Sequence, residues 1–255
     1  MTSIVSRTLS VHKEHEVLLK FESAGLTDDL AQKVIESKDN ELAAKVVRLI
    51  ENGGFEPTTG QKRARGIMGG NMFGIEEGVK FFGMNPSKQQ LAALTEIPFT
   101  EETLNASKDT HILAAVFPLS ILDIRGKVKN SLFYSHDDAW YNKERFANDR
   151  GETSWQLICK TPVPDSTSKN WDAQQALLGK EEETPTVRIM TYAIVGHYLS
   201  TGERLFENIY VRCSDVDSDG YRVRVGRFDS KGLLVGSLWD DDRGSGIGLA
   251  SARKF

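Results

Sequence analysis

The sequence predicts an α+β fold, and the order of its elements is the main reason. Residues 1–53 carry apolar positions at helical spacing, whereas residues 209–253 carry four strand-like runs separated by polar or glycine turns. Between these two blocks strand and helix patterns alternate only briefly, which differs from the regular repeat of a parallel βαβ protein. We therefore expect a small helical N-terminal module followed by a larger α+β domain.

Composition limits the classes of function. The chain has 255 residues, of which 39% are hydrophobic, and a net charge of -4. This size and apolar content suffice for at least one core, and a mildly acidic chain is a poor match to a protein that coats nucleic acid. No apolar run approaches the roughly 20 residues that cross a bilayer. Because Met1–Ser10 also lacks the apolar region of a secretory signal, we expect a cytoplasmic location.

Three helices are expected in the module at 1–53. Val17, Leu18 and Phe21 recur at helical spacing before a stop at Gly25. Thr27 is a suitable N-cap for a second helix that has acidic residues in its first turn. A third helix opens near residue 39 and ends at 53–54, where two glycines follow. Three short helices of this kind can bury a small shared face.

Residues 54–108 are predicted to form a linker and a helical hairpin. The segment 53–71 is rich in glycine, has little apolar content and contains the basic cluster 62–65, formed by Lys62, Arg63 and Arg65. The hairpin at 75–94 consists of two expected helices, Ile75–Phe82 and Ser87–Leu94, joined by a tight turn. Two interpretations are open: a packing or spacer element, or a helix-turn-helix that presents Lys88, Gln89 and Gln90 to DNA.

Residues 109–255 are predicted to form the α+β domain. The apolar stretch 111–124 contains Pro118, which favours an edge strand or a kinked strand. A helix is expected at 140–148, with Trp140, Tyr141 and Phe146 on its buried side. The remaining expected elements are a strand at 155–160, helices at 172–178 and 185–199, and strands at 209–213, 221–228, 232–239 and 247–253.

No set of residues predicts catalysis, a metal site or a cofactor. Cys159 and Cys213 lie in apolar strand-like runs. Two interpretations are open for them: two buried reduced thiols, or a single disulfide bridge between core strands. The acidic run 215–219 lacks the glutamate of a calcium-binding loop, because that position is Gly226, and it therefore predicts a solvated turn. Asp240–Asp242 predicts an exposed loop that pairs with a neighbouring arginine. The histidines are scattered without metal-ligand spacing, and no nucleophile motif is present.

The end of the chain carries a distinctive series of motifs. Val223-Arg-Val-Gly226 is followed by Trp239-Asp-Asp-Asp-Arg243 and by Gly248-Leu-Ala-Ser-Ala-Arg-Lys-Phe255. In these motifs the chain resembles the variable (target) proteins of diversity-generating retroelements. The resemblance is strong over 222–255 and looser, by element order, from about Asp109 onward. It implies a C-type lectin-like fold, related to that of formylglycine-generating enzymes, for residues 109–255, with a variable region at about 221–246.

The resemblance also implies a non-catalytic ligand-binding protein. Reverse transcription of a template copy with errors opposite adenines would diversify the binding face. Asn codons in the template can then become codons for most amino acids, but not for Met, Gln, Lys, Glu or Trp. Between Tyr221 and Gly246 only Lys231 and Trp239 fall outside the accessible set, so these two are expected to be fixed. A formylglycine-generating site needs a pair of reactive cysteines, and neither cysteine lies in the final loop region.

Strand alternation divides the variable region into an inward and an outward set. The inward set is Val223, Val225, Phe228, Leu233 and Val235. The outward set, which is the expected variable face, is Arg224, Arg227, Leu234, Gly236, Ser237, Leu238, Asp242, Gly244, Ser245 and Gly246. The core must then be held by residues that do not vary, and the expected scaffold is Trp239 and Arg243 together with Ile247, Leu249 and Ala250.

The expected partner is a macromolecule. The outward positions span several strands and loops and would form a broad patch, which suits a protein ligand. The alternative function is a DNA-associated protein that uses the hairpin at 75–94 and the basic cluster 62–65.

Overall fold

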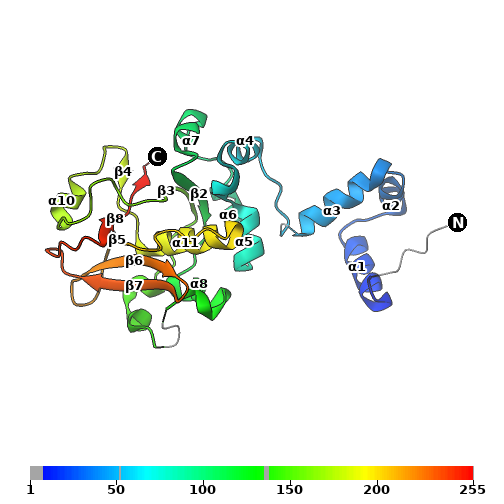
Figure 1. The fold of residues 1–255 in the computed structure, drawn as a ribbon. Helices are drawn as coiled ribbons and strands as arrows, with labels where there is room; N and C mark the ends of the chain where they lie inside the picture. The colour runs from blue at the N-terminus through cyan, green and yellow to red at the C-terminus, as the bar shows by residue number, and fades with distance from the viewer. Residues whose placement is uncertain (1–7, 52, 135–137, 255) are drawn as a thin grey trace. The chain divides into compact units, whose positions relative to one another are not determined.

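The computed structural model of the chain describes residues 8–51, 53–134 and 138–254 (Figure 1). It divides into two compact units, unit 1 at Met1–Glu51 and unit 2 at Asn52–Phe255. Helices and two separate β-sheets occur together, which confirms the predicted α+β class. Within the described residues no helix combines the length and apolarity needed to span a bilayer. Most of Met1–Ser10, on which the expectation about a secretory signal rests, lies outside the described residues.

Unit 1 consists of three short helices and one 3-10 turn. Their bounds are α1 Val11–Ser23, α2 Asp28–Ile35, η1 Lys38–Asn40 and α3 Glu41–Glu51. The Thr27 hydroxyl accepts a hydrogen bond from the Leu30 N–H, so Thr27 is the N-cap that the sequence predicts. The expectation of a shared buried face is wrong for the described residues, because none of the three α-helices has a buried side chain.

Unit 2 begins earlier than expected, and the predicted linker at 53–71 is wrong over most of its length. Helix α4 spans Thr59–Met68, followed by η2 Gly69–Asn71 and strand β1 Met72–Phe73. A capping box between Thr58 and Gln61 starts α4, and Gln61, Ala64 and Met68 are buried. The helical pattern of α4 is difficult to recognise in the sequence, because few of its residues are apolar and several glycines lie within it and beside it. Residues 54–108 therefore belong to the same compact unit as 109–254.

Gln61 provides a test of this correction. Its Nε2 donates to the Leu94 carbonyl (2.6 Å) and its Oε1 accepts from the Thr58 N–H (2.8 Å), while its side chain is buried. Gln61→Ala is expected to lower the free energy of unfolding of unit 2 by about 2 kcal/mol, because a buried bond and a helix cap are both lost. Lys62→Ala, at an exposed neighbour, should change it by less than about 0.5 kcal/mol. Urea midpoints that do not differ between the two variants would restore the linker interpretation.

The two helices expected at 75–94 are confirmed as α5 Ile75–Phe82 and α6 Lys88–Ala93. Helix α6 begins at a capping box between Ser87 and Gln90, whereas at the start of α5 the Glu77 carboxylate accepts from the Gly74 N–H. Gly83 ends α5 in the left-handed region, with φ +56°. The other helical elements of unit 2 are α7 Glu101–Ser107, α8 Ile121–Lys127, η3 Asn130–Leu132, η4 Trp140–Lys143, α9 Arg145–Asn148, α10 Trp171–Gln175 and α11 Val187–Thr201. Tyr141 and Phe146 are buried as predicted, but Trp140 is 45% exposed and its Nε1 donates to the Val235 carbonyl.

The first sheet has the order β1-β2-β3-β9-β4. Its further strands are β2 His111–Val116, β3 Ser154–Cys159, β4 Glu182–Glu183 and β9 Ala252–Arg253. Strand β2 pairs with β1 on one side and with β3 on the other, so it is a central strand, and the edge position, one of the two expected alternatives, is wrong. The physical reason is that β2 ends at Val116, before Pro118, and the proline removes no ladder hydrogen bond.

The second sheet has the order β7-β6-β5-β8. Its strands are β5 Tyr210–Val216, β6 Arg222–Asp229, β7 Gly232–Leu238 and β8 Ile247–Leu249. The single strand predicted at 247–253 is divided between the two sheets, because β8 pairs with β5 while β9 pairs with β3 and β4. The chain passes from the second sheet to the first at Ala250 and Ser251. There the Ala250 N–H donates to the Arg212 carbonyl, and the Ser251 carbonyl accepts from the Cys159 N–H.

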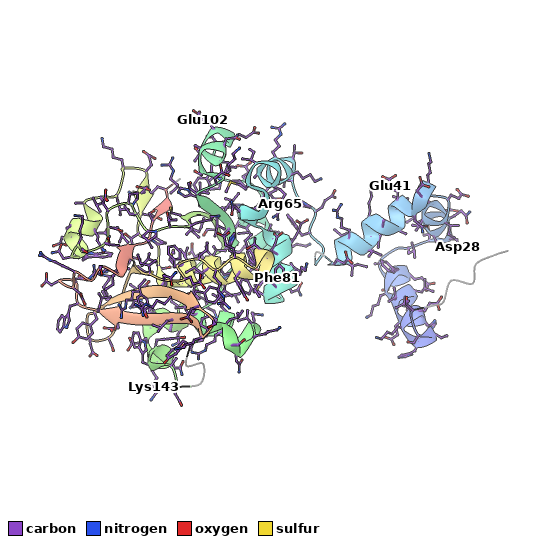
Figure 2. The ribbon with its side chains drawn as sticks, in the orientation of Figure 1. Asp28, Glu41, Arg65, Phe81, Glu102 and Lys143 are labelled. Atoms are coloured by element: carbon purple, nitrogen blue, oxygen red, sulfur yellow. The ribbon has the colours of Figure 1, made fainter. Side chains whose placement is uncertain are left out.

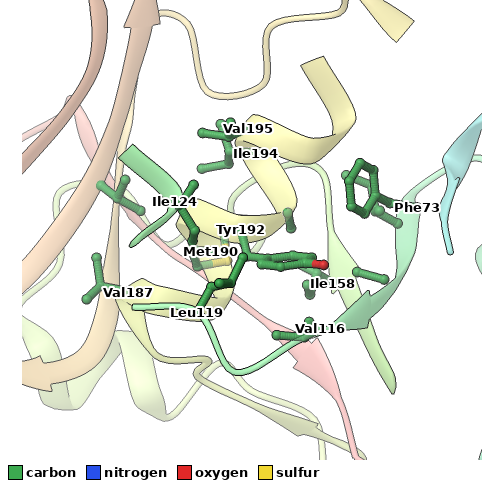
Figure 3. Close-up of a cluster of buried hydrophobic side chains, with 14 of the residues drawn as sticks. Phe73, Val116, Leu119, Ile124, Ile158, Val187, Met190, Tyr192, Ile194 and Val195 are labelled. Carbon is green, nitrogen blue, oxygen red and sulfur yellow. The ribbon is translucent and has the colours of Figure 1, made fainter. Parts of the chain in front are cut away.

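Helix α11 is the centre of the core of unit 2. It contacts β1 and β2 of the first sheet and β5 and β6 of the second, and Figure 1 shows it in the middle of this unit. Of the residues from Val187 to His197 all but Ile189 are buried, so the helix is enclosed around most of its circumference. Figure 3 shows Met190, Tyr192 and Ile194 among side chains of other elements. The Tyr192 hydroxyl donates to the Ala115 carbonyl, so its one polar group is satisfied.

Candidate binding surface

Strands β6 and β7 separate the inward and outward sets largely as predicted. Val223, Val225, Phe228, Leu233 and Val235 are all buried, which confirms the inward set. Arg224 pairs with Gly236 and Gly226 pairs with Leu234, so Arg224, Leu234 and Gly236 share the other face of the sheet. These three side-chain positions are half-buried rather than fully exposed.

Two members of the expected variable face are placed differently. Ser237 pairs with Val223 and therefore lies on the inward face, near the end of β7. Leu238 is 8% exposed. It pairs with Arg222, whose guanidinium lies 3.8 Å from the centre of the Trp171 ring and forms a two-bond ion pair with Asp240. This end of the outer face is thus occupied by side chains from outside β7.

Arginine and tyrosine side chains cover the middle of the outer face. The guanidinium of Arg224 lies over the Tyr210 ring at 4.2 Å, and that of Arg227 lies over the same ring at 5.3 Å. Arg227 is exposed and has a left-handed backbone, with φ +43°. Burial lowers the pKa of Arg224, which nevertheless stays charged at physiological pH. The Tyr210 ring is buried at 8% exposure, so this part of the surface presents fixed positive charge held over an aromatic ring.

The loop 239–246 continues this surface beyond the end of β7. Asp241, Asp242, Arg243 and Ser245 are exposed, and Gly244 and Gly246 are half-buried. The predicted pairing of this acidic loop with an arginine is confirmed by Asp240 and Arg222, which are 3.0 Å apart. The exposure of Asp242 and Ser245 agrees with their assignment to the outward set.

Arg212, which the sequence analysis missed, holds this loop in place. It lies on β5 with its side chain fully buried. Its Nη2 donates to the carbonyls of Trp239 (3.2 Å) and Asp242 (2.7 Å). Its Nη1 donates to the Lys169 carbonyl (3.0 Å) and to Gln174 Oε1 (2.9 Å). Burial lowers the pKa of Arg212, and the carboxylates of Asp242 and Asp240 oppose this effect.

Further main-chain bonds fasten the same loop. The Trp171 N–H donates to the Asp240 carbonyl (2.8 Å), and the Ser168 N–H donates to the Gly244 carbonyl (3.2 Å). The Tyr210 N–H donates to the Gly246 carbonyl (3.0 Å). In each case the loop contributes a backbone carbonyl and the partner lies outside 221–246. The attachment therefore does not depend on which side chains the loop carries.

The scaffold role predicted for Trp239 and Arg243 is wrong as regards burial. Trp239 is 66% exposed and Arg243 is exposed, whereas Ile247, Leu249 and Ala250 are buried as predicted. The Trp239 ring packs edge-on against Tyr221 with centroids 4.3 Å apart. Only the Trp239 carbonyl takes part in the anchoring by Arg212. A signal for Arg212 was present in the sequence, since it is a charged residue inside the apolar run 209–213.

The exposure of Trp239 changes its expected effect on stability. Trp239→Ala should lower the free energy of unfolding by about 1 kcal/mol, because the loss is confined to one aromatic contact and partial burial. A core tryptophan would cost about 3 to 5 kcal/mol. Denaturant unfolding distinguishes these values, and Phe228→Ala, at a fully buried aromatic of β6, is the matched control for the larger one. A cost for Trp239→Ala equal to that of the control would place Trp239 in the core.

The other polar groups considered in the sequence have structural roles. The run 215–219 ends β5 and forms a turn, as predicted, with Asp217 Oδ1 accepting from the N–H groups of residues 219 and 221. Asp215 Oδ2 accepts from the Val187 N–H at the start of α11, and burial raises the pKa of Asp215. Both cysteines are free; Cys213 is buried, which raises its pKa, and Cys159 is half-buried. Among the described residues no three His, Cys, Asp or Glu side chains are grouped to hold a metal ion.

The basic cluster 62–65 is engaged in ion pairs. Lys62 lies 3.9 Å from Glu56, and Arg63 lies 3.2 Å from Glu101. Arg65 forms a 2.5 Å ion pair with Glu77 and also donates to the Met72 carbonyl. The three cations thus lie beside carboxylates, and helix α6 has six residues, which is short for a groove-reading helix.

Comparisons of the chain with models of protein families, with curated proteins and with solved structures gave no match.

Proposed function

We propose that this chain is a non-catalytic binding protein whose binding surface is diversified by a retroelement through adenine-directed mutagenesis. The proposal includes a C-type lectin-like fold for the domain that carries the surface, with which the two-sheet α+β architecture of unit 2 is compatible. The proposed surface consists of Arg224, Arg227, Leu234 and Gly236 on the sheet and of Asp242, Gly244, Ser245 and Gly246 in the loop. Trp239 joins it as a constant aromatic contact, because it is exposed.

The observation that carries the proposal is the way in which the loop 239–246 is anchored. Its carbonyl groups are held by Arg212 and by the N–H groups of residues 168, 171 and 210, all outside 221–246. A loop held by its backbone keeps its conformation when its side chains change, which is what a diversified site requires. Gln174 supports the same arrangement by donating to the Ser166 and Ile247 carbonyls (2.7 and 3.2 Å) and accepting from Arg212.

The chemistry of the surface favours a protein ligand. Exposed Trp239, half-buried Tyr221 and several arginines lie on it, and Trp, Tyr and Arg dominate the binding energy of protein interfaces. Acidic and basic side chains are mixed, with Arg222 and Asp240 paired, so the surface lacks the uniform positive charge that binds a phosphate backbone. No observation on the hairpin at 75–94 favours the alternative of DNA binding, since the nearby cations at 62–65 are paired.

Two libraries test the proposal. In the first, Arg224, Arg227, Asp242 and Ser245 are randomised together; in the second, Arg212, Gln174 and Ser166, whose side chains make the supporting hydrogen bonds, are randomised. We expect most members of the first library to fold, as measured by soluble yield and cooperative unfolding, and few of the second. Equal failure in both would show that the proposed surface is structural.

A second experiment tests the diversification itself. Sequencing the DNA around the gene should reveal a reverse transcriptase gene beside a near-copy of the segment that encodes residues 222–255. The two copies should differ at adenines of the template, and the differences should lie in codons of the proposed surface. A locus without such a copy would overturn diversification while leaving the binding surface to be tested by the libraries.

A further inference from the structure

Unit 1 exposes most of its apolar side chains. Within residues 8–51 its three α-helices bury none, and most of the large apolar side chains that the described chain exposes belong to this unit. Ile35 is 74% exposed and Ile50 is 63% exposed. Figure 2 shows the side chains of unit 1 projecting from its helices. Folded helices that leave their apolar faces in water are marginal by themselves, because helical stability comes mainly from packing of such a face.

The apolar side chains of α3 form a continuous stripe. At 100° per residue, Leu42, Val46, Leu49 and Ile50 fall on one side of the helix, at the spacing that lines a helix–helix contact. The opposite side carries Glu41, Ala44 and Arg48, and Lys45 at the edge of the stripe pairs with Glu41 at 2.8 Å. The helix thus has one face suited to water and one suited to a partner.

The exposed apolar area is sufficient for a stable interface. A fully exposed Leu, Val or Ile side chain offers about 100 Å² of apolar surface, as its transfer free energy implies. About a dozen of them, each about half exposed, leave about 600 Å² in water. A standard interface buries about 800 Å² on each partner, of which a little more than half is apolar. Unit 1 alone therefore meets the apolar requirement of one interface.

We propose that unit 1 associates with unit 1 of a second copy of this chain. Each of its three helices is acidic in the first turn and basic in the last, as in Glu41 and Arg48 of α3, so two copies that pack antiparallel bring unlike charges together. Unit 2 does not offer a matching surface among its described residues, because its large exposed apolar side chains are few and lie on separate elements: Tyr134, Trp140, Leu177, Val216 and Trp239. A second copy of unit 1 does offer one, because the two copies expose equal apolar areas and each can cover that of the other.

The consequence for binding is multivalency. Two associated chains carry two copies of unit 2, and a ligand with repeated epitopes would be held by both. Self-association itself does not depend on the proposed function, since it rests on unit 1 alone.

Sedimentation of the full chain tests this inference. At tens of micromolar we expect a species of at least twice the chain mass of 28.4 kDa, which dissociates on dilution. The helical far-ultraviolet circular dichroism signal should fall over the same range of dilution, because the helices of unit 1 lose stability when dissociation exposes their apolar faces. The double variant Val46→Glu, Leu49→Glu should be monomeric throughout this range, with at least a tenfold weaker association.

The matched control is the double variant Ala44→Glu, Gln32→Glu, which adds the same charge at exposed positions outside the α3 stripe. It should associate like the original chain. Cooperative unfolding of unit 2 must be unchanged in both variants, which separates loss of association from loss of the fold. A chain that is monomeric at all concentrations overturns the proposal, whether unit 1 then stays helical, docks on unit 2 or awaits a different protein. Equal weakening by the control variant also overturns it.

Discussion

Replacing Arg212 by methionine is expected to destabilise unit 2 by on the order of 4 kcal/mol, because one buried and three partly buried acceptors lose a charged donor at once. The guanidinium bonds to the carbonyls of Lys169, Trp239 and Asp242 and to the amide oxygen of Gln174. Methionine fills a similar volume without donating to any of them. Urea unfolding measures the loss, and faster amide hydrogen exchange in the loop 239–246 would show that its attachment is broken.

Arg224→Met is the control for this change. Arg224 is the cross-strand neighbour of Arg212 and lies on the same face of the sheet. It is half-buried over the Tyr210 ring, and its Nε has no hydrogen-bond partner in the described part of the chain. Its replacement should cost about 1 kcal/mol or less, as expected for a cation–π contact at a partly exposed site. Equal costs for the two arginines would mean that the anchor of the loop lies elsewhere.

Gly226→Ala is expected to cost about 3 kcal/mol or more, although this position lies inside the expected variable region. Gly226 has φ +146°, and a Cβ there would overlap the Ile209 carbonyl oxygen and lie 2.9 Å from the Tyr210 Cα. Both obstacles are backbone atoms of the neighbouring strand, so the strand pair must open to admit a side chain. The bulge that follows Gly226 in β6 depends on this geometry.

Gly246→Ala is the matched substitution for Gly226→Ala. An added Cβ at Gly246 meets no heavy atom within 4 Å, and the backbone of this residue is outside the left-handed region. Gly246→Ala should change the free energy of unfolding of unit 2 by about 0.5 kcal/mol at most. If diversification occurs as proposed, the template should encode Gly226 without a mutable adenine. Frequent substitution at Gly226 in a variable population would contradict the structural requirement.

The alternation of side chains along β6 and β7 predicted burial correctly at some positions and wrongly at others. Alternation correctly assigned Val223, Val225 and Val235 to the core, because successive strand side chains point to opposite faces regardless of context. It could not place Ser237, whose face depends on its register with Val223. Leu238 was misassigned for a different reason: it is buried beside its cross-strand partner Arg222 of β6, whose guanidinium packs on the Trp171 ring.

Residue type was a poor guide to burial at Trp239. Trp239, which lies outside the set of accessible codons, was expected to be a core anchor, yet it is exposed on the loop, and a charged residue, Arg212, is the one that is buried. A buried arginine is stable only where several acceptors converge on it, and these come from positions 169, 174, 239 and 242. Such convergence joins distant parts of the chain, so the charged residue in the apolar run 209–213 signals burial locally but does not show which acceptors it meets.

The sequence by itself determined the α+β class, the N-cap at Thr27 and the hairpin helices, because capping residues, glycines and apolar spacing act within a few residues. Only the tertiary structure decided that α4 belongs to unit 2, that residues 247–253 divide between two sheets and that Arg212 holds the loop 239–246. Each of these depends on which distant segments pack together. Burial is a property of that packing, and a period in the sequence reveals which side chains share a face but not what covers it.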